Sequence, residues 1–299
     1  MAWGWSERDI PDLSGRVAVV TGANRGLGRE VTRYLAGAGA RVIMACRDEA
    51  GGEEAAAAVR AEHPTALVEV RPLDLASLAS VEKFASELAG EPRLDVLGNN
   101  AGLMAVDRGL TADGFELHMG VNHLGHFALT LRLLPLLQAT TGSRIVTMSS
   151  IVARVGHVDL DDLFWERRPY ERWQAYCQSK LANLLFTFEL DRRLRASGSP
   201  TAALAAHPGG SRTGLGNTGG SLSNRLLPAW KLFAQSAAGG ALPFVRAATD
   251  PKAFAGEYYG PQLQVWGPPV RERPSRRSRD PELAAALWAR SEALTGVRW

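Results

Sequence analysis

The sequence predicts an α/β protein with a doubly wound parallel sheet of about seven strands and helices on both faces. Strand-like apolar segments alternate with helical segments along the whole chain, a glycine-rich turn follows the first of them, and neither a linker nor a repeat interrupts the pattern. Parallel strands are joined by crossover helices, and their sheets are covered on both faces, so this alternation indicates a Rossmann-type sheet. We therefore expect one domain over residues 1–299.

The individual elements follow from apolar periodicity and from their end signals. Strands are expected over 16–21, 41–45, 66–70, 94–98, 144–148, 201–205 and 263–266, and helices over 26–35, 49–61, 78–88, 115–137 and 171–196. Ser77 is expected to cap the helix that follows it. Asp280 before Pro281 predicts the start of a C-terminal helix at about 281–295. The Gly- and Ser-rich segment at about 209–241, with a short helix near 226–233, is expected to form a substrate lid.

The composition is that of an ordinary globular protein, with 45% hydrophobic and 22% charged residues. Two cysteines predict no disulfide framework. The N-terminus has no signal-peptide pattern and the most apolar window is interrupted by Pro and Lys, so we expect a cytoplasmic protein without a membrane span. A net charge of +3 suits an anionic cofactor as well as nucleic acid. We expect no nucleic-acid partner, and a homo-oligomer is left open.

The turn at residues 22–28 joins a strand to a helix and contains three glycines. Such a turn brings the backbone close to a pyrophosphate, which the N–H groups of the helix N-terminus then bind. Arg47 ends the second strand where an acidic residue would select NAD, and Arg25 in the turn could reach the same phosphate. Two guanidinium groups favour the 2′-phosphate of NADP. Asp48 is counter-evidence, although we assign it to capping the next helix.

Tyr176 and Lys180 lie four residues apart in a helical segment and therefore on one face. An ammonium beside a phenol is expected to lower the pKa of that phenol, which then exchanges a proton with a substrate oxygen. Ser149 and Ser150 follow the fifth strand, at the sheet edge where ligands bind. A hydroxyl there could polarise a carbonyl oxygen.

These motifs, in this order, resemble the short-chain dehydrogenase/reductase superfamily, in the subfamily with a TGxxxGxG turn and a YxxxK pair. The resemblance covers about residues 12–266. It implies Asn122, Ser150, Tyr176 and Lys180 as catalytic residues. It implies cofactor contacts from Gly22, Asn24, Arg25, Gly26, Leu27, Gly28, Arg47, Asp74, Leu75, Asn100, Ala101, Gly102, Tyr176, Lys180, Pro208, Gly209 and Thr213, and it implies no metal.

Within that superfamily, residues 45–48 and 179–183 are similar to the branch of retinol dehydrogenases, WW-domain oxidoreductases and protochlorophyllide reductases. That branch generally favours NADP(H), so we expect NADP(H) and accept NAD(H) as an alternative. Two features depart from the short family pattern. Gly98 replaces an apolar residue and is expected to loosen the end of its strand, and the segment 157–173 lengthens the interval between Ser150 and Tyr176. We expect this segment to flank the substrate mouth.

The resulting expectation is hydride transfer between NADP(H) and a ketone or aldehyde, or the corresponding alcohol, with a hydrophobic small-molecule substrate. Reduction of an activated C=C bond is one alternative. A non-catalytic NADP-binding scaffold is another, although the full set of four catalytic residues argues against it. His118, His123 and His126 share one helix with no carboxylate or Cys to complete a metal site, and we interpret them as packing and surface residues.

Overall fold

The structure is a computed structural model that describes residues 4–210 and 235–299. Its centre is an eight-stranded sheet in the order β3-β2-β1-β4-β5-β6-β7-β8. The strands are β1 Val17–Thr21, β2 Arg41–Cys46, β3 Leu67–Pro72, β4 Val96–Asn99, β5 Arg144–Met148, β6 Ala202–Ala206, β7 Tyr258–Pro261 and β8 Pro269–Glu272. All neighbouring strands are parallel except β7 and β8, which are antiparallel. The predicted fold class is confirmed.

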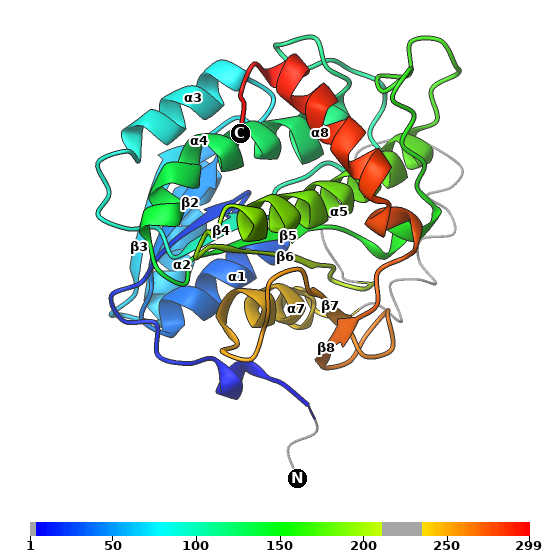
Figure 1. Ribbon diagram of the computed structural model, residues 1–299. Coiled ribbons are helices and arrows are strands. Elements are labelled where there is room, and N and C mark those ends of the chain that lie inside the picture. The colour runs from blue at the N-terminus through cyan, green and yellow to red at the C-terminus, as the bar shows by residue number, and fades with distance from the viewer. Residues whose placement is uncertain (1–3, 211–234) are drawn as a thin grey trace.

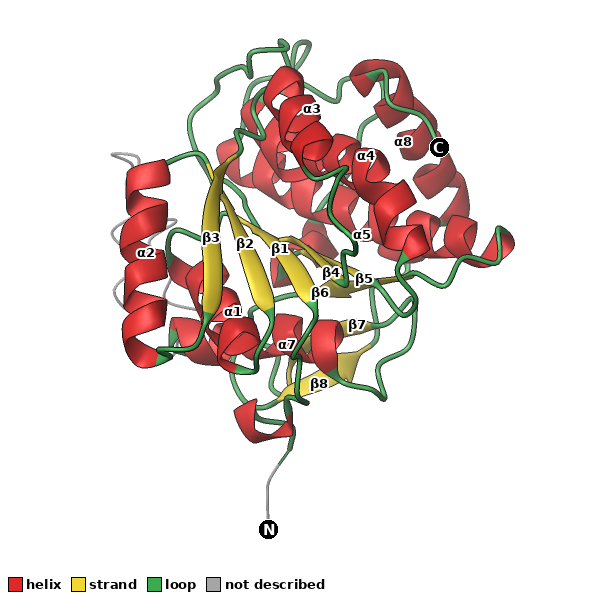
Figure 2. Ribbon diagram, turned by 90° about the vertical axis from the view of Figure 1, so that its left-hand side faces the viewer, coloured by secondary structure: helices red, strands yellow, loops and turns green. Residues whose placement is uncertain are grey.

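Helices cover both faces of this sheet (Figure 1). One layer holds α1 Gly26–Gly37, α2 Glu49–Glu62 and α7 Ala237–Thr249, and the other holds α3 Leu78–Glu87, α4 Gly125–Ala139 and α5 Arg172–Ala196, as Figure 2 shows from the side. The C-terminal helix α8 Pro281–Thr295 packs outside α5. Asp48, Ser77 and Asp280 accept hydrogen bonds from the first backbone N–H groups of α2, α3 and α8, as expected of capping residues.

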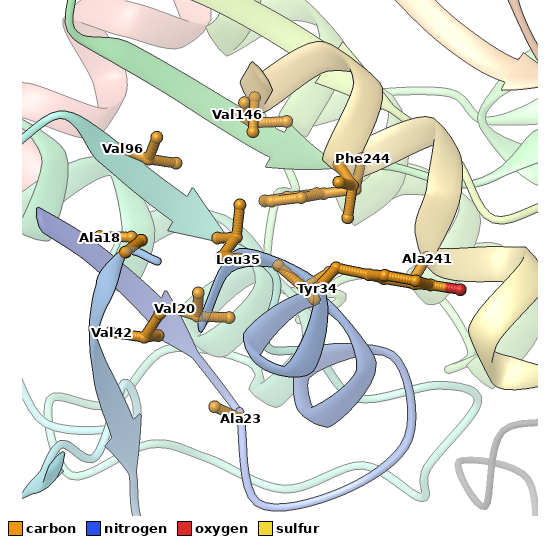
Figure 3. Close-up of a cluster of buried hydrophobic side chains, with 14 of the residues drawn as sticks. Ala18, Val20, Ala23, Tyr34, Leu35, Val42, Val96, Val146, Ala241 and Phe244 are labelled. Atoms are coloured by element: carbon orange, nitrogen blue, oxygen red, sulfur yellow. The ribbon is translucent and has the colours of Figure 1, made fainter. Parts of the chain in front are cut away.

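Both faces of the central strands are buried, which explains why they read as continuous apolar segments. Along β1, Ala18 and Val20 point into the core beneath α1 and α7, and Val17 and Val19 point into the core on the other face. Figure 3 shows the first of these cores, where the Phe244 ring of α7 approaches the sheet beside Leu35 of α1. The two cores fix the sheet between the helical layers.

Gly98 does not loosen β4, contrary to the sequence-based expectation, because the strand continues to Asn99. A Cβ at position 98 would lie 3.1 Å from both Phe244 Cζ and the Val19 carbonyl oxygen. The missing side chain therefore makes room for the phenylalanine of α7, and the glycine serves packing.

Three other expectations are wrong. Residues 263–266 form the connection between β7 and β8, because the chain reverses there into an antiparallel hairpin. The helix expected over 115–137 is divided into a π-helix at His118–Leu124 followed by α4. The predicted lid range overlaps α7 from Ala237 onward, where a Ser236 cap starts a helix that packs on α1. The short helix expected near 226–233 lies outside the described residues.

Candidate active site

The predicted site residues gather where the strand order reverses. β1 and β4 are neighbours in the sheet, but the chain runs from β1 to β2 on one side and from β4 to β5 on the other. Crossover connections therefore leave in opposite directions and open a crevice at the carboxyl ends of these strands. The glycine turn follows β1, residues 100–102 follow β4, Ser150 follows β5 and Pro208 follows β6. The topology brings all four segments to one edge.

The glycine turn has the geometry of an anion-binding loop. Gly22 and Gly26 have φ values of +64° and +56°, which favour glycine. A Cβ on Gly28 would lie 2.3 Å from the carbonyl oxygen of Gly22, so this position also requires glycine. Arg25, the N-cap of α1, makes no side-chain capping bond. The first N–H groups of α1 thus stay available for a ligand phosphate.

Asn100 adds a second feature that fits a bound cofactor. Its side-chain amide donates to the Thr21 carbonyl oxygen at 2.8 Å. Its Oδ1 atom is buried and has no hydrogen-bond partner among the described residues. A buried acceptor of this kind calls for a donor, and a ribose hydroxyl would provide one.

Arg25 and Arg47 both lie exposed at this edge, and neither forms an ion pair with a described residue. The Asp48 carboxylate accepts from Gly51 N at 3.0 Å, so it is used as the cap of α2. Asp74 lies in the loop after β3 and accepts from Ala76 N at 2.9 Å, whereas Leu75 is buried in the core beneath α4.

The side chains of Ser150, Tyr176 and Lys180 converge below that edge. Tyr176 and Lys180 are both buried on α5, and the Lys180 Nζ atom lies 5.9 Å from the centre of the tyrosine ring. The Ser150 hydroxyl lies close enough to the Tyr176 phenol to influence its pKa, and it accepts from Val152 N at 3.5 Å. Ser149, in contrast, donates its hydroxyl to the Lys180 carbonyl oxygen at 2.8 Å, which is a structural contact. The structure therefore separates the roles of the two serines.

The pKa of Tyr176 is raised in this structure, not lowered as expected from the sequence. Burial raises the pKa of Tyr176 to about 12, and the nearby Ser150 hydroxyl opposes this rise. Burial also lowers the pKa of Lys180 to about 8. The lysine donates to the Met148 carbonyl oxygen at 3.2 Å, so the ammonium is directed at the backbone of β5. At neutral pH the phenol keeps its proton and the lysine is still mostly charged.

Asn122 lies on the π-helix, in the middle of the helix that precedes α4. Its side chain accepts from Leu103 N at 2.7 Å and donates to the Leu103 carbonyl oxygen at 3.0 Å. It also donates to the Ser179 hydroxyl on α5 at 2.9 Å. π-helical turns occur frequently at functional sites because they redirect backbone groups. Asn122 thus ties the segment after β4 to the helix that carries Tyr176.

Pro208 and Gly209 follow β6 at the same edge. Gly209 has a φ of +63°, and a Cβ there would lie 2.5 Å from the Val265 carbonyl oxygen. Its N–H donates to His207 Nδ1 at 3.2 Å, and His207 Nε2 lies 2.9 Å from a carboxylate oxygen of Glu272. The strand β8 therefore holds the backbone of this segment. Thr213 lies outside the described residues.

Sequence reasoning missed a polar cluster beside Tyr176, formed by the buried Glu116 and His118 and the half-buried Tyr170. The Tyr170 hydroxyl donates to Glu116 Oε1 at 2.9 Å, and His118 Nδ1 lies 2.8 Å from the same oxygen. The His118 ring centre is 6.1 Å from that of Tyr176. All three histidines of this region are buried, so their interpretation as packing residues is confirmed and the surface part of that interpretation is wrong. The signal was their spacing within an otherwise apolar helix.

The segment 157–173 lies against this cluster, as expected of a wall of the site. Its Trp165 packs edge-on against Tyr170, with ring centres 5.9 Å apart. The guanidinium carbon of Arg168 lies 3.8 Å from the centre of the Trp165 ring. Trp173 packs edge-on against Tyr176 at 6.2 Å. Rings from the π-helix and from the start of α5, those of His118 and Trp173, thus lie beside the tyrosine.

A doubly wound sheet with a glycine turn at its switch point and a buried Tyr–Lys pair defines a nicotinamide-dependent oxidoreductase. A family model described as short chain dehydrogenase matches residues 16–220. The chain belongs to this family, in the branch of the retinol dehydrogenases.

Its relatives support this assignment over nearly the whole chain. Human retinol dehydrogenase 13 is 43% identical over 293 residues, which cover 95% of this chain and 86% of that protein. Mouse polyprenol dehydrogenase is 42% identical over 298 residues, with 96% and 86% covered.

Solved structures show the same architecture. An uncharacterized protein from Mycobacterium paratuberculosis matches with a TM-score of 0.83 and 46% identity, over 99% of both chains. A short chain dehydrogenase from Shigella flexneri, complexed with NADP, matches with a TM-score of 0.64 and 25% identity, over 83% of this chain and 97% of that one. In the described part of the chain, no helix is both long and apolar enough to cross a membrane.

Proposed function

We propose that this enzyme reduces an apolar aldehyde or ketone with NADPH, and that it catalyses the reverse oxidation of the alcohol. The observation that carries the proposal is the pair of buried side chains Tyr176 and Lys180 on one face of α5, with Lys180 Nζ 5.9 Å from the tyrosine ring centre and Ser150 beside the phenol. This arrangement places an acid, a hydrogen-bonding hydroxyl and a cation around one point. A cytoplasmic location and the absence of a nucleic-acid partner are part of this proposal.

The bound cofactor would supply the hydride, and the residues around it would handle the proton. Ser150 would hold the carbonyl oxygen of the substrate, and Tyr176 would donate its proton to that oxygen. A phenol whose pKa is raised by burial is protonated at neutral pH, as an acid must be. The charged Lys180 would stabilise the phenolate left behind. Asn122 would keep the segment after β4 in position against α5.

NADP(H) is proposed over NAD(H) because two exposed guanidinium groups, neither in an ion pair with a described residue, border the cofactor edge. Arg47 follows β2 directly and Arg25 precedes α1. The Asp48 carboxylate, which follows Arg47 in the sequence, is engaged in capping α2. A 2′-phosphate between two arginines would form charge-assisted hydrogen bonds, whereas the Asp48 carboxylate that ribose hydroxyls would need already caps α2.

A bulky, apolar substrate is proposed from the aromatic wall of Trp165, Tyr170, Trp173 and Tyr176. Relatives named for retinol and polyprenol, both long apolar alcohols, support the same class. Such substrates gain affinity mainly by burying apolar surface, which the rings of segment 157–173 provide.

The test is NADPH oxidation with retinal, with smaller aldehydes and ketones, and with enones, by the wild type and by Tyr176→Phe. We expect turnover of aldehydes, and we expect the variant to lose at least about a hundredfold in kcat because it lacks the acid. NADPH binding, followed by fluorescence, should change little. If enones are reduced at the C=C bond and keep their C=O group, the result favours a C=C reductase. If NADPH binds but no substrate is turned over, the result favours a non-catalytic scaffold.

A further inference from the structure

His126 lies in the first turn of α4, fully buried, and both of its ring nitrogens have hydrogen-bond partners. Nδ1 lies 3.0 Å from the backbone carbonyl oxygen of Asn122, and Nε2 lies 2.9 Å from the Thr21 hydroxyl. Asn122 belongs to the predicted catalytic set, and Thr21 ends the strand before the glycine turn. One imidazole ring thus bridges the helix beside the catalytic residues and the cofactor edge.

The direction of each hydrogen bond follows from the chemistry of the partners. A carbonyl oxygen only accepts, so Nδ1 must carry the proton. Burial lowers the pKa of His126 to about 4, so the ring is neutral at physiological pH and Nε2 carries no proton. The Thr21 hydroxyl must therefore donate to Nε2.

This donation leaves the Thr21 oxygen free to accept, and two backbone groups use it. The N–H groups of Asn100 and Ala101 both donate to Thr21 Oγ1 at 2.9 Å. A hydroxyl has one proton and two lone pairs, so all three are now used. The Gly98 carbonyl oxygen, 3.2 Å away, competes for the same proton. Because the Thr21 hydroxyl donates to His126 and not to Gly98, its lone pairs point toward the N–H groups of residues 100 and 101.

Asn122 completes a closed circuit of hydrogen bonds, which runs from His126 through Thr21 and residues 100–103 back to Asn122. Its side chain binds both backbone groups of Leu103, and its carbonyl oxygen accepts from His126. The segment 100–103 is therefore held at both ends by groups that His126 joins. Gly102 lies between these ends, and a Cβ there would lie 3.0 Å from Asn122 Oδ1 and 3.3 Å from Lys180 Nζ. The circuit sets how closely this backbone approaches the lysine.

We propose that His126 is a positioning residue for hydride transfer, which fixes the segment 100–103 against Lys180 through Thr21 and Asn122. It touches neither substrate nor cofactor and acts only through these two residues. The proposal rests on the proposed function, because the effect of positioning is measured as a change in the turnover of a carbonyl substrate. Side chains that keep only one of the two hydrogen bonds should keep part of the effect.

The first test compares three variants at position 126 with a matched control. His126→Phe loses both hydrogen bonds, His126→Asn keeps an N–H directed at the Asn122 carbonyl, and His126→Gln keeps an acceptor within reach of Thr21. The control is His123→Phe, because His123 is equally buried one turn earlier, and among the described residues its ring bonds only to Ser291 on α8. All four proteins are assayed for kcat and for the KM of the aldehyde, at temperatures well below their measured unfolding midpoints.

We expect His126→Phe to lose about a hundredfold in kcat, because misplacement of a bound reactant by about 1 Å has an effect of this size. The KM of the aldehyde should stay within about twofold, and the isotope effect with deuterated NADPH should rise as hydride transfer becomes limiting. His126→Asn and His126→Gln should lie between this variant and the wild type, and His123→Phe should match the wild type. A folded His126→Phe protein with unchanged kcat and isotope effect would overturn the proposal.

The second test does not depend on turnover. The ¹⁵N shifts of histidine in the full-length protein report which ring nitrogen carries the proton. We expect an Nδ1-protonated neutral ring for His126 in the wild type, and the Thr21→Val variant should shift the Nε2 signal. A ring protonated on Nε2 would overturn the proposal whatever the enzyme turns over. The expected tautomer in a protein that reduces no carbonyl would instead place the failure with the proposed function.

Discussion

At the residue scale, the burial of Lys180 opposes the positive charge that its proposed role requires. Its side chain is buried against β5, which lowers its pKa to about 8, yet the proposed chemistry needs its positive charge beside the phenolate. Reduction should therefore be supported while the lysine is protonated, below pH 8, and lost as the pH rises through that value.

The corresponding prediction concerns the pH profile of kcat/KM for aldehyde reduction. In the wild type we expect an alkaline limb near pH 8. In Lys180→Arg the limb should move beyond the measurable range, because a guanidinium stays protonated in proteins. The level of the plateau should fall, since the planar group cannot reproduce the contact with Met148 O. An unchanged limb in this variant would assign the titration to another group.

A second prediction at this scale tests cofactor choice. Arg47→Asp should lower kcat/KM for NADPH by about tenfold to a hundredfold, the range for losing a hydrogen bond to a charged group, and should raise it for NADH. Arg8→Asp makes the same charge change at an exposed position in the N-terminal segment and serves as the control. The NADP assignment fails if the two variants shift the NADPH values equally.

Elements differ in how well the sequence predicts them. The six strands β1 to β6 and the helix α5 were predicted to within about two residues, because buried parallel strands and capped helices leave strong local patterns. The hairpin of β7 and β8 was misplaced, since Tyr258–Pro261 is short and its register depends on pairing with distant strands. The π-helix was also missed, because close approaches such as Gly120 to Thr111 are tertiary contacts that no local pattern shows.

The segment 157–173 provides the prediction at this scale. Tyr170→Phe removes the hydroxyl that joins this segment to Glu116, so the aromatic wall should become looser while Tyr176 stays in place. We expect the KM for a bulky aldehyde to rise about threefold to tenfold, with kcat within about twofold. The loss of one hydrogen bond to a charged group corresponds to about 1.5–3 kcal/mol of stability at most.

Tyr34→Phe is the matched control for this change. It removes a tyrosine hydroxyl that contacts the Ala238 carbonyl oxygen at 3.4 Å, between α1 and α7 on the opposite face of the sheet. Its KM should equal that of the wild type. Equal effects of both variants on KM would show that the substrate wall does not depend on the Glu116 cluster.

At the scale of the whole molecule, the motif positions predicted from the sequence meet at one sheet edge, because topology rather than sequence distance brings strand ends together. The charges inside the site were predicted less well. The opposing effects of burial on Tyr176 and Lys180 depend on how deeply α5 is covered by the sheet and by the π-helix, which residue spacing alone does not reveal.

That burial also has a consequence for stability. A lysine whose pKa falls from 10.5 to about 8 on folding costs the folded state roughly 3 kcal/mol at pH 7, at about 1.4 kcal/mol for each pH unit. The folded protein binds fewer protons than the unfolded chain between these two values, so this cost shrinks as the pH rises from 8 to 10.5. Below pH 8 it is fully present.

Lys180→Met should therefore abolish turnover and yet raise the free energy of unfolding at pH 7, by an amount on the order of 1–3 kcal/mol once the lost bond to Met148 O is counted. The gain over the wild type should shrink between pH 8 and pH 10.5. Urea unfolding of both proteins across this range measures the difference, and Lys83→Met, at an exposed lysine, should show no gain. A Lys180→Met protein less stable than the wild type at pH 7 would contradict this prediction. It would show that the buried lysine stabilises the folded state, so that burial would not explain its low pKa.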